Sequence, residues 1–309
     1  MLESEQLGST KVLITGITSS IGVYTIGWIK ENIPNVEIFG CGRNRETLEK
    51  ISKTYNIDAR FVDFDNENDL AKNSEEFAKI DLDYIFHLAT ISPSGTKQKS
   101  QFYKTNFIGP RIFFEGIFQL HKPSFLNFSS ASLYDFNALH LSENAPRNYG
   151  SDYGMSKYLF ENYLNQYKKL ASLLSVRIPV LLAPSVKHNF ISEWESQVQL
   201  CGKVTLFNPD HAFNSCAWLG DIYHFALYYF SKQKNDHLVC NVGASSPISI
   251  GESLEIYLKE RECCAEIISY ASPRPSQHYD SSLAMRNGYI PKTVRECITR
   301  YARSLKISS

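Results

Sequence analysis

The sequence predicts an α/β protein built on a doubly wound parallel (Rossmann) sheet, with a smaller α/β lobe toward the carboxyl end. Up to residue 178, short apolar runs rich in β-branched residues alternate with stretches of helical periodicity. The first of these runs ends in a glycine-containing turn that leads into a helix. From Pro179 onward the chain is richer in proline, asparagine and serine turns, and its helices are shorter.

Length, composition and charge fit this class. The 309 residues exceed the roughly 150 expected of one domain, and 43% are apolar against 21% charged, which is ordinary for a packed protein. The 32 basic and 32 acidic side chains cancel, which argues against a dedicated binder of nucleic acid or membrane surfaces. No apolar run approaches the roughly 18 residues of a membrane-spanning helix, and the polar amino terminus lacks the features of a secretion signal.

The seven cysteines and eight histidines predict no metal site. The cysteines form no C-x-x-C pair, and the histidines form no H-E-x-x-H motif. Reduced and mostly buried thiols are typical of a cytoplasmic protein. We therefore expect a cytoplasmic protein that binds no metal.

Six buried strands are expected in the amino-terminal part, each a short apolar run between turn residues. They are expected at 11–15, 36–39, 59–62, 83–89, 124–128 and 173–178. The helices that fit between them are expected at 21–31, 45–55, 66–79, 105–121 and 152–170. Strands that alternate with helices in this way describe βαβ units on a parallel sheet.

The weaker regularity after Pro179 suggests two domains. Residues 1–178 are predicted to form the dinucleotide-binding domain, and residues 179–309 the smaller substrate-binding lobe. Its helices are expected near 192–201, 219–231, 251–261 and 293–305. One more strand, at 238–242, is a candidate to return to the main sheet. The cleft between the two domains is the expected binding site.

The turn after the first strand has the composition of a phosphate-binding loop. Gly16 and Gly22 occupy the first and last glycine positions, where glycine permits a tight turn and the close approach of a pyrophosphate. A serine replaces the middle glycine, at a cost of about 1 kcal/mol if that position needs positive φ. The alternative interpretation is an ordinary strand-to-helix turn. The position of the loop after the first strand of several βαβ units favours the phosphate-binding interpretation. The expected cofactor contacts in the loop are Gly16, Thr18, Ser19, Ser20, Ile21 and Gly22.

The second strand ends without the acidic residue that binds a free ribose 2′-hydroxyl. Its end reads Phe39-Gly-Cys-Gly-Arg-Asn-Arg45. A guanidinium can bind a 2′-phosphate through two hydrogen bonds, so Arg43 and Arg45 predict NADP in preference to NAD. The alternative is that both arginines are merely solvated at the start of a helix.

Tyr153 and Lys157 are candidates for acid–base chemistry. They lie four residues apart on one face of a predicted helix, where a cation would lower the pKa of the phenol toward neutral pH. The same spacing recurs at Tyr228 and Lys232, which we interpret as chance. The first pair differs from the second in its context. A serine cluster, Ser129-Ser-Ala-Ser132, precedes it at the carboxyl end of the fifth predicted strand, and ligands bind at this edge of a parallel sheet.

These residues resemble the extended short-chain dehydrogenase/reductases, the NAD(P)-dependent epimerase/dehydratase family, whose members mostly act on nucleotide sugars. The resemblance covers about residues 11 to 300. Besides the glycine loop, it rests on motifs that occur in the family's order. They are Phe86-His-Leu-Ala89, Asn106-Phe-Ile-Gly109, Ser129-Ser-Ala-Ser-Leu-Tyr134, Tyr153-Gly-Met-Ser-Lys157, Val176-Arg-Ile-Pro179, Trp218-Leu-Gly-Asp221, Asn241-Val-Gly243, Arg274-Pro275 and Gly288-Tyr-Ile-Pro291.

The resemblance implies a role for each matching residue. The catalytic triad would be Ser130, Tyr153 and Lys157, and Lys157 would also hold the nicotinamide ribose. The further cofactor contacts would be Asp63, at the adenine amino group, with Phe64, Leu88, Ala89 and Asn106. Ser132 and Arg274 would contact the substrate, Arg274 at a nucleotide diphosphate. The expected assembly is a homodimer.

Three positions depart from the family's pattern. Ala131 and Ser132 stand where its dehydratases place an acid pair, which argues against 4,6-dehydration. The segment Pro179-Val-Leu-Leu182 lacks the asparagine of many sugar-nucleotide enzymes. Asp135 replaces a glycine, and we infer nothing from it.

Three hypotheses follow. The first is a reductase or epimerase that acts on a keto or hydroxyl carbon of a nucleotide sugar. The second keeps the fold and the triad but takes a non-nucleotide ketone or alcohol. The third is a non-catalytic dinucleotide-binding regulator, which the altered glycine loop suggests and the intact Ser130, Tyr153 and Lys157 oppose.

Overall fold

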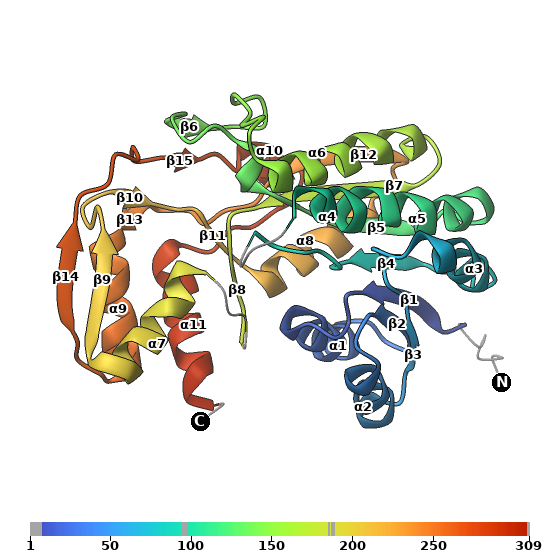
Figure 1. Ribbon diagram of the computed structural model, residues 1–309, viewed down its shortest axis with the longest axis horizontal. Helices are drawn as coiled ribbons and strands as arrows, with labels where there is room; N and C mark the ends of the chain where they lie inside the picture. Colours follow the sequence, from blue (N-terminus) through green and yellow to red (C-terminus); the bar gives the residue numbers. More distant parts are fainter. Residues whose placement is uncertain (1–7, 94–97, 185, 187–188, 308–309) are drawn as a thin grey trace, which may run out of the picture.

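Seven parallel strands form the central sheet of the computed structural model, which describes residues 8–93, 98–184, 186 and 189–307. Their order across the sheet is β12-β7-β5-β4-β1-β2-β3 (Figure 1). The strands are β1 (Thr10–Thr15), β2 (Val36–Gly42), β3 (Asp58–Phe61), β4 (Tyr84–His87), β5 (Ser124–Ser130), β7 (Ser172–Ile178) and β12 (Asp236–Asn241). Because the order reverses between β1 and β4, the sheet is doubly wound, and the predicted fold class is confirmed.

Helices cover both faces of this sheet (Figure 1). One face carries α1 (Ser20–Asn32), α2 (Arg45–Tyr55) and α8 (Leu219–Ser231). The other carries α3 (Glu67–Ala78), α5 (Gly109–Leu120) and α6 (Asp152–Leu164). In β1, Val12 and Ile14 pack into the first core and Leu13 into the second. Burial on both faces explains why the strands are continuous apolar runs.

The helix expected at 105–121 begins earlier in the structure and is not continuous. It starts with α4 (Lys99–Tyr103), which a π-helical turn over Lys104–Ile108 joins to α5. A Cβ atom added at Gly109 would lie 2.1 Å from the carbonyl oxygen of Phe64, so glycine is needed for α5 to approach the loop after β3. The wide turn buries Thr105 and Asn106 against the site described below.

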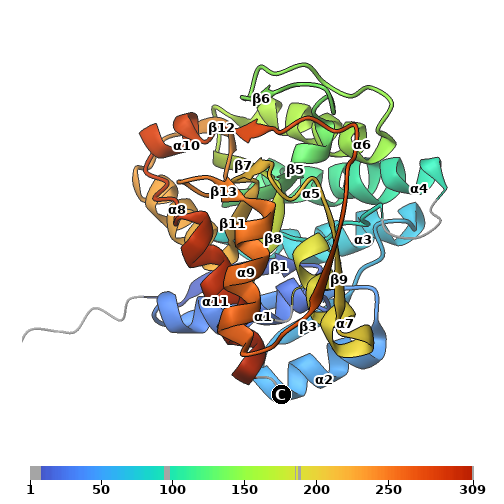
Figure 2. The same cartoon turned by 90° about the vertical axis from the view of Figure 1, so that its left-hand side faces the viewer.

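The carboxyl-terminal lobe is built from helices and short two-stranded ribbons (Figure 2). Its helices are α7 (Phe190–Cys201), α9 (Ile250–Arg261) and α11 (Val294–Ile307). The short helix α10 (Ser282–Arg286) instead contacts β12 and buries Ala284 in the first core of the main sheet. Three ribbons pair β8 (Val180–Leu182) with β11 (Cys216–Trp218), β9 (Lys203–Phe207) with β14 (Glu266–Tyr270), and β10 (Ala212–Phe213) with β13 (Ile248–Ser249). A fourth ribbon joins β6 (His140–Leu141), which precedes residue 178, to β15 (His278–Tyr279). Trp194, Tyr257 and Tyr301 fill a separate core between α7, α9 and α11.

The lobe after residue 178 is interrupted by a segment that belongs to the main sheet. Helix α8 packs on the first face, and β12 pairs with β7 from Asp236 opposite Ser172 to Asn241 opposite Arg177. The strand considered at 238–242 therefore does return to the sheet, because the fully buried β7 needs a neighbour on its outer edge. No helix in the described ranges is long and apolar enough to cross a membrane.

Candidate functional site

The candidate site lies at the carboxyl ends of β1, β4 and β5, where the strand order reverses. Thr15 ends β1, His87 ends β4 and Ser130 ends β5. Thr15 Oγ1 lies 2.8 Å from His87 Nδ1 and accepts a hydrogen bond of 3.2 Å from the Ala89 amide. These contacts fix the loop after β4 against the loop after β1, so the two form one surface.

A cavity of about 200 Å³ opens between these loops and the end of β2. It is lined by residues from four separate segments of the chain, all of which the sequence predicts as cofactor contacts. They are Gly16, Thr18, Ser19, Arg43, Asp63, Phe64, Leu88 and Ala89. Thr90, Ile91 and Thr105, which the sequence did not single out, line it as well.

The geometry of the glycine loop fits the pyrophosphate of a dinucleotide. Gly16 has φ of +70°, and a Cβ atom there would lie 2.8 Å from the Ala89 backbone. Ser19 caps α1 by accepting a hydrogen bond of 3.0 Å from the Gly22 amide. No acidic side chain occupies the first turn of α1, so its positive end is free for an anion.

The serine in place of the middle glycine carries no backbone strain. Ser19 has φ of −81°, an ordinary extended conformation, so the penalty considered for a positive φ does not arise. Ser20 and Ile21 begin the helix behind the loop without lining the cavity. Their assignment to the cofactor stays a prediction.

The two arginines after β2 have different surroundings. Arg43 is exposed and lines the cavity. The guanidinium of Arg45, the first residue of α2, stacks 3.8 Å from the centre of the Phe61 ring instead. Of these two arginines, Arg43 is the one that lines the cavity.

Asn106 is completely buried and does not line the cavity. Its side chain accepts hydrogen bonds from Thr90 Oγ1 (3.0 Å) and the Ile91 amide (2.9 Å), and it donates to Ile91 O and Ser156 Oγ, both at 3.2 Å. All four hydrogen-bonding positions of its amide are occupied, and these bonds shape the loop after β4. The contact of Asn106 with the cofactor stays a prediction.

The three predicted catalytic residues converge beside this loop. Ser130 accepts a hydrogen bond of 3.1 Å from the Ser132 amide at the start of a short 3-10 helix, Ala131–Leu133. Tyr153 and Lys157 come from the first two turns of α6. The hydroxyls of Ser130 and Thr90 lie near the phenol of Tyr153. Ser132, the predicted substrate contact, is half-buried directly beyond Ser130.

The pKa of Tyr153 differs from the sequence prediction. Burial is the largest influence and raises the pKa above 10, whereas the hydrogen bonds with Ser130 and Thr90 lower it. Ser130 and Thr90 therefore oppose the effect of burial and favour the phenolate. The lowering expected from Lys157 stays a prediction.

Lys157 is a buried amine. Burial lowers its pKa to about 8, and the carboxylate of Glu161 opposes that shift. Its ammonium forms no hydrogen bond or ion pair within the described part of the chain. Burial lowers the pKa of His87 well below its usual range, and the positive charge of Lys157 acts in the same direction. A buried cation without a partner is suited to bind polar atoms of a ligand.

A buried ion pair anchors α6 below the site. One turn beyond Lys157, Glu161 accepts two hydrogen bonds from Arg177 on β7, at 3.1 and 2.8 Å. Arg177 also donates to the Tyr134 hydroxyl and the Glu143 carbonyl, both at 2.9 Å. These contacts hold α6 against the sheet. None of them was predicted from the sequence.

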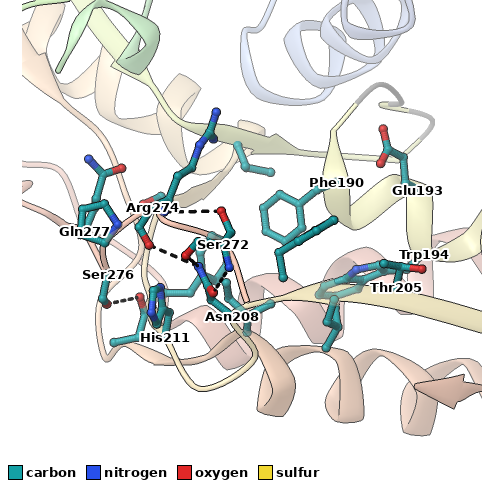
Figure 3. A pocket seen from close by; sticks show the side chains of 18 of the residues that line it. Phe190, Glu193, Trp194, Thr205, Asn208, His211, Ser272, Arg274, Ser276 and Gln277 are labelled. Atoms are coloured by element: carbon teal, nitrogen blue, oxygen red, sulfur yellow. Dashed lines mark hydrogen bonds between the residues drawn. The ribbon is translucent and has the colours of Figure 1, made fainter. Parts of the chain in front are cut away.

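A larger cavity of about 500 Å³ lies in the carboxyl-terminal lobe, between α7, β9 and the segment after β14 (Figure 3). Arg274, the predicted substrate contact, lines it and packs 5.1 Å from the Phe136 ring. Phe190 lies between Arg274 and Glu193 in this view. The other aromatic lining residues are Trp194, Phe207 and Phe213.

Asn208 holds the segment that carries Arg274. Its amide donates to the carbonyls of Ser272 (3.1 Å) and Arg274 (3.2 Å) and accepts from the Ser272 amide at 2.7 Å (Figure 3). Its backbone is in the left-handed region, with φ of +50°. The sequence reading missed this residue, although asparagine is one of the few side chains that adopt this conformation readily.

Other candidate groups do not form sites. The described residues contain no cluster of histidine, cysteine or carboxylate side chains that could hold a metal. All seven cysteines are free, and Cys201 and Cys264 are exposed. Tyr228 and Lys232 form a surface pair, with the ammonium 4.3 Å from the ring centre and Tyr228 47% exposed.

Comparisons with known proteins agree with this geometry. The family model of the NAD dependent epimerase/dehydratase family matches residues 12–243. No curated protein matches the sequence. The structure is similar to that of Helicobacter pylori ADP-L-glycero-D-manno-heptose-6-epimerase, with a TM-score of 0.81, 18% identity and 96% of each chain covered.

Two further solved structures share the fold. Bacillus cereus UDP-glucuronic acid 4-epimerase, in complex with UDP-glucuronic acid and NAD, has a TM-score of 0.77 and 19% identity, over 97% of this chain and 100% of that one. Thermotoga maritima UDP-glucose 4-epimerase, with UDP-glucose, has a TM-score of 0.75 and 17% identity, over 97% and 99%. At these identities the likeness shows the Rossmann-like α/β fold.

Proposed function

Because the chain belongs to the NAD dependent epimerase/dehydratase family, we propose that it reduces or epimerises a keto or hydroxyl carbon of a nucleotide sugar, with NADP or NAD as its cofactor. One observation carries this proposal. The hydroxyls of Ser130 and Thr90 lie near the phenol of Tyr153, and Thr90 lines the cavity of the glycine loop. This arrangement supports a proton-transfer role for Tyr153 next to the cavity proposed for the dinucleotide. The names of the three neighbours, which are epimerases of ADP- or UDP-linked sugars, support the substrate class.

The residues of the smaller cavity fit a dinucleotide. Gly16 and the first turn of α1 would hold the pyrophosphate, Asp63 the adenine amino group and Lys157 the nicotinamide ribose. When bound, the nicotinamide supplies reversible two-electron oxidation and reduction of a substrate carbon.

Tyr153 and the side chains around it would each have a separate role in the reaction. Tyr153 exchanges a proton with the substrate oxygen, and Ser130 donates a hydrogen bond to the same oxygen. Lys157, whose pKa is about 8, is mostly protonated at neutral pH and adds a positive charge to the site. Ala131 and Ser132 offer no acid to a leaving hydroxyl, so the proposal excludes 4,6-dehydration.

The first test concerns the cofactor. NADP is expected to bind more tightly than NAD, because Arg43 lines the cavity and no acid follows β2. A charge-assisted pair of about 1.5–3 kcal/mol corresponds to roughly ten- to a hundredfold in affinity. Arg43→Ala should remove this preference in fluorescence titrations with both cofactors. Arg45→Ala is the matched control and should keep it, since Arg45 stacks on Phe61. Equal affinities, or tighter binding of NAD, would show that the NADP prediction is wrong.

The second test concerns the larger cavity. A nucleoside diphosphate such as UDP or ADP should raise the melting temperature of the cofactor-bound protein by mass action. Asn208→Gly keeps a backbone that favours positive φ but removes the amide that holds Arg274, so it should reduce the shift about as far as Arg274→Ala does. Both variants should still bind the cofactor. No shift in the wild type at millimolar nucleotide would contradict the nucleotide assignment.

The non-nucleotide alternative is favoured by one feature of that cavity. Among the described lining residues, Arg274 is the sole lysine or arginine, and the carboxylate of Glu193 partly offsets its charge. Such a lining would also suit a ketone or alcohol with an aromatic body. The homodimer and the cytoplasmic location stay predictions.

A further inference from the structure

Arg274 lines the larger cavity and is exposed. Asn208 holds its backbone, but the guanidinium forms no hydrogen bond or ion pair with another residue in the described ranges. The guanidinium lies instead over the ring of Phe136, with 5.1 Å between its carbon atom and the ring centre. The direction of this exposed side chain therefore depends on Phe136.

Phe136 itself does not line the larger cavity. It lies in the loop between Tyr134 and β6, and it is 50% exposed. A guanidinium is attracted to the face of an aromatic ring, and its planar shape allows it to stack there. The contact therefore restricts an arginine side chain that would otherwise adopt many rotamers in solvent.

A second residue of the cavity holds the Phe136 loop. Gln277 lies three positions after Arg274, and its Nε2 donates to the carbonyl oxygens of Ala138 at 2.8 Å and Phe136 at 3.2 Å. The pairing of β15 with β6 continues this contact along the chain. The segment that carries Arg274 and the loop that carries Phe136 are thus joined by hydrogen bonds as well as by the stacked pair.

The Phe136 loop also continues from the serine of the proposed triad. One turn of 3-10 helix separates Ser130 from Tyr134. Tyr134 is buried, and its hydroxyl accepts a hydrogen bond of 2.9 Å from Arg177 and donates one of 2.6 Å to Asn241. Because Tyr134 is fixed in the interior, Phe136 has a defined position relative to Ser130.

Two carboxylates lie in the neighbourhood of Arg274 without pairing with it in the described part of the chain. Glu193 lines the same cavity, but Phe190 lies between it and Arg274 (Figure 3). Asp135, next to Phe136, accepts a hydrogen bond of 2.8 Å from a backbone amide of its own turn. The guanidinium is therefore available to a phosphate, with which arginine forms strong charge-assisted hydrogen bonds.

We propose that Phe136 is a positioning residue for the substrate: its ring holds the Arg274 guanidinium in place to bind a phosphate oxygen, at a defined distance from Ser130. The guanidinium would stack on the ring with its face and donate to the phosphate with its N–H edge, so the two contacts are compatible. Gln277 supports this arrangement by holding the loop. The inference rests on the proposed function for the nucleotide diphosphate that Arg274 would contact.

The test compares Phe136→Leu with Phe136→Tyr in the cofactor-saturated protein, by calorimetric titration with UDP and with inorganic pyrophosphate. Leucine keeps an apolar side chain but loses the aromatic face, so it should weaken the binding of both ligands about two- to fivefold. Phe136→Tyr should keep the wild-type affinity. The KM for the best nucleotide sugar should rise in Phe136→Leu, while kcat and the affinity for the cofactor stay close to those of the wild type. Leu139→Ala is the matched control on the same loop and should change none of these values, because Leu139 is 64% exposed.

A measurement without nucleotide separates this proposal from the proposed function. Arginine labelled with ¹³C at Cδ gives a signal for Arg274, identified by its loss in Arg274→Lys, and the ring current of Phe136 should shift its δ-protons. This shift should disappear in Phe136→Leu and persist in Phe136→Tyr.

Three results would count against the proposal. An unchanged arginine signal or unchanged affinities in Phe136→Leu would overturn it. Equal losses in Phe136→Leu and Phe136→Tyr would overturn it by assigning the effect to packing of the loop. If the wild type bound neither UDP nor pyrophosphate at millimolar concentration, the nucleotide assignment and the phosphate role of Arg274 would both be wrong, whereas the arginine signal would still show whether the ring holds the guanidinium.

Discussion

Tyr153→Phe is expected to lower turnover by about 10² to 10⁴ fold. The substitution removes the phenolic proton and almost no volume, so the fold and the affinity for the cofactor should survive. The reason is that Tyr153 is the residue proposed to exchange the proton with the substrate oxygen, and the hydroxyls of Ser130 and Thr90 lie near its phenol. Steady-state rates with the best nucleotide sugar, together with cofactor titrations, measure both expectations.

Tyr228→Phe is the control for Tyr153→Phe. Tyr228 has the same spacing to a lysine as Tyr153, but it lies on the surface of α8. Turnover should remain close to that of the wild type. If Tyr153→Phe kept more than about a tenth of the wild-type rate, the triad assignment would be wrong and the non-catalytic regulator would become the better hypothesis.

Arg177→Met is expected to reduce the free energy of unfolding by about 3–5 kcal/mol, because it leaves the buried Glu161 carboxylate without its partner. Both side chains of the pair are less than 5% exposed. The substitution also removes the donors to the Tyr134 hydroxyl and the Glu143 carbonyl. Denaturant unfolding followed by circular dichroism would measure the loss.

Arg303→Met is the matched comparison. It breaks the pair with Glu260, in which the arginine side chain is 66% exposed, so the expected loss is much smaller than that in Arg177→Met. The double variant Glu161→Gln/Arg177→Met should lose less than the sum of the single variants, since neither charge is then left alone. A loss in Arg177→Met no larger than that in Arg303→Met would contradict the role given to the buried pair.

The sequence predicted the main sheet well because its strands are buried on both faces. Each strand is therefore a short apolar run, and the helices between them have clear starts and ends. The ribbon strands of the second lobe lack this signal. Every residue of β14, Glu266–Tyr270, is exposed or half-buried, so its pattern does not differ from that of a loop.

The candidate site was predictable where residues act next to each other in the chain. The glycine loop and the Tyr153–Lys157 pair each occupy a single segment. The residues that were missed act through segments brought together by folding. Asn208 supports a turn 64 positions away, at Ser272. Thr90 lies near the phenol of Tyr153 on α6. The available signal for Thr90 was a threonine directly after an apolar strand. No sequence signal indicated the hydrogen bonds that the buried Asn106 side chain makes.

The return of β12 to the sheet has a consequence for how the protein is made. A ribosome releases β7 long before β12, because residues 179–235 are synthesised between them. Until β12 emerges, the fully buried β7 has an open edge of unpaired amides and carbonyls, which is a surface prone to pairing with other chains. The first domain therefore cannot complete its sheet during translation until the chain up to Asn241 has left the ribosome. A gene fragment that ends at residue 178 would encode a sheet that lacks its last strand.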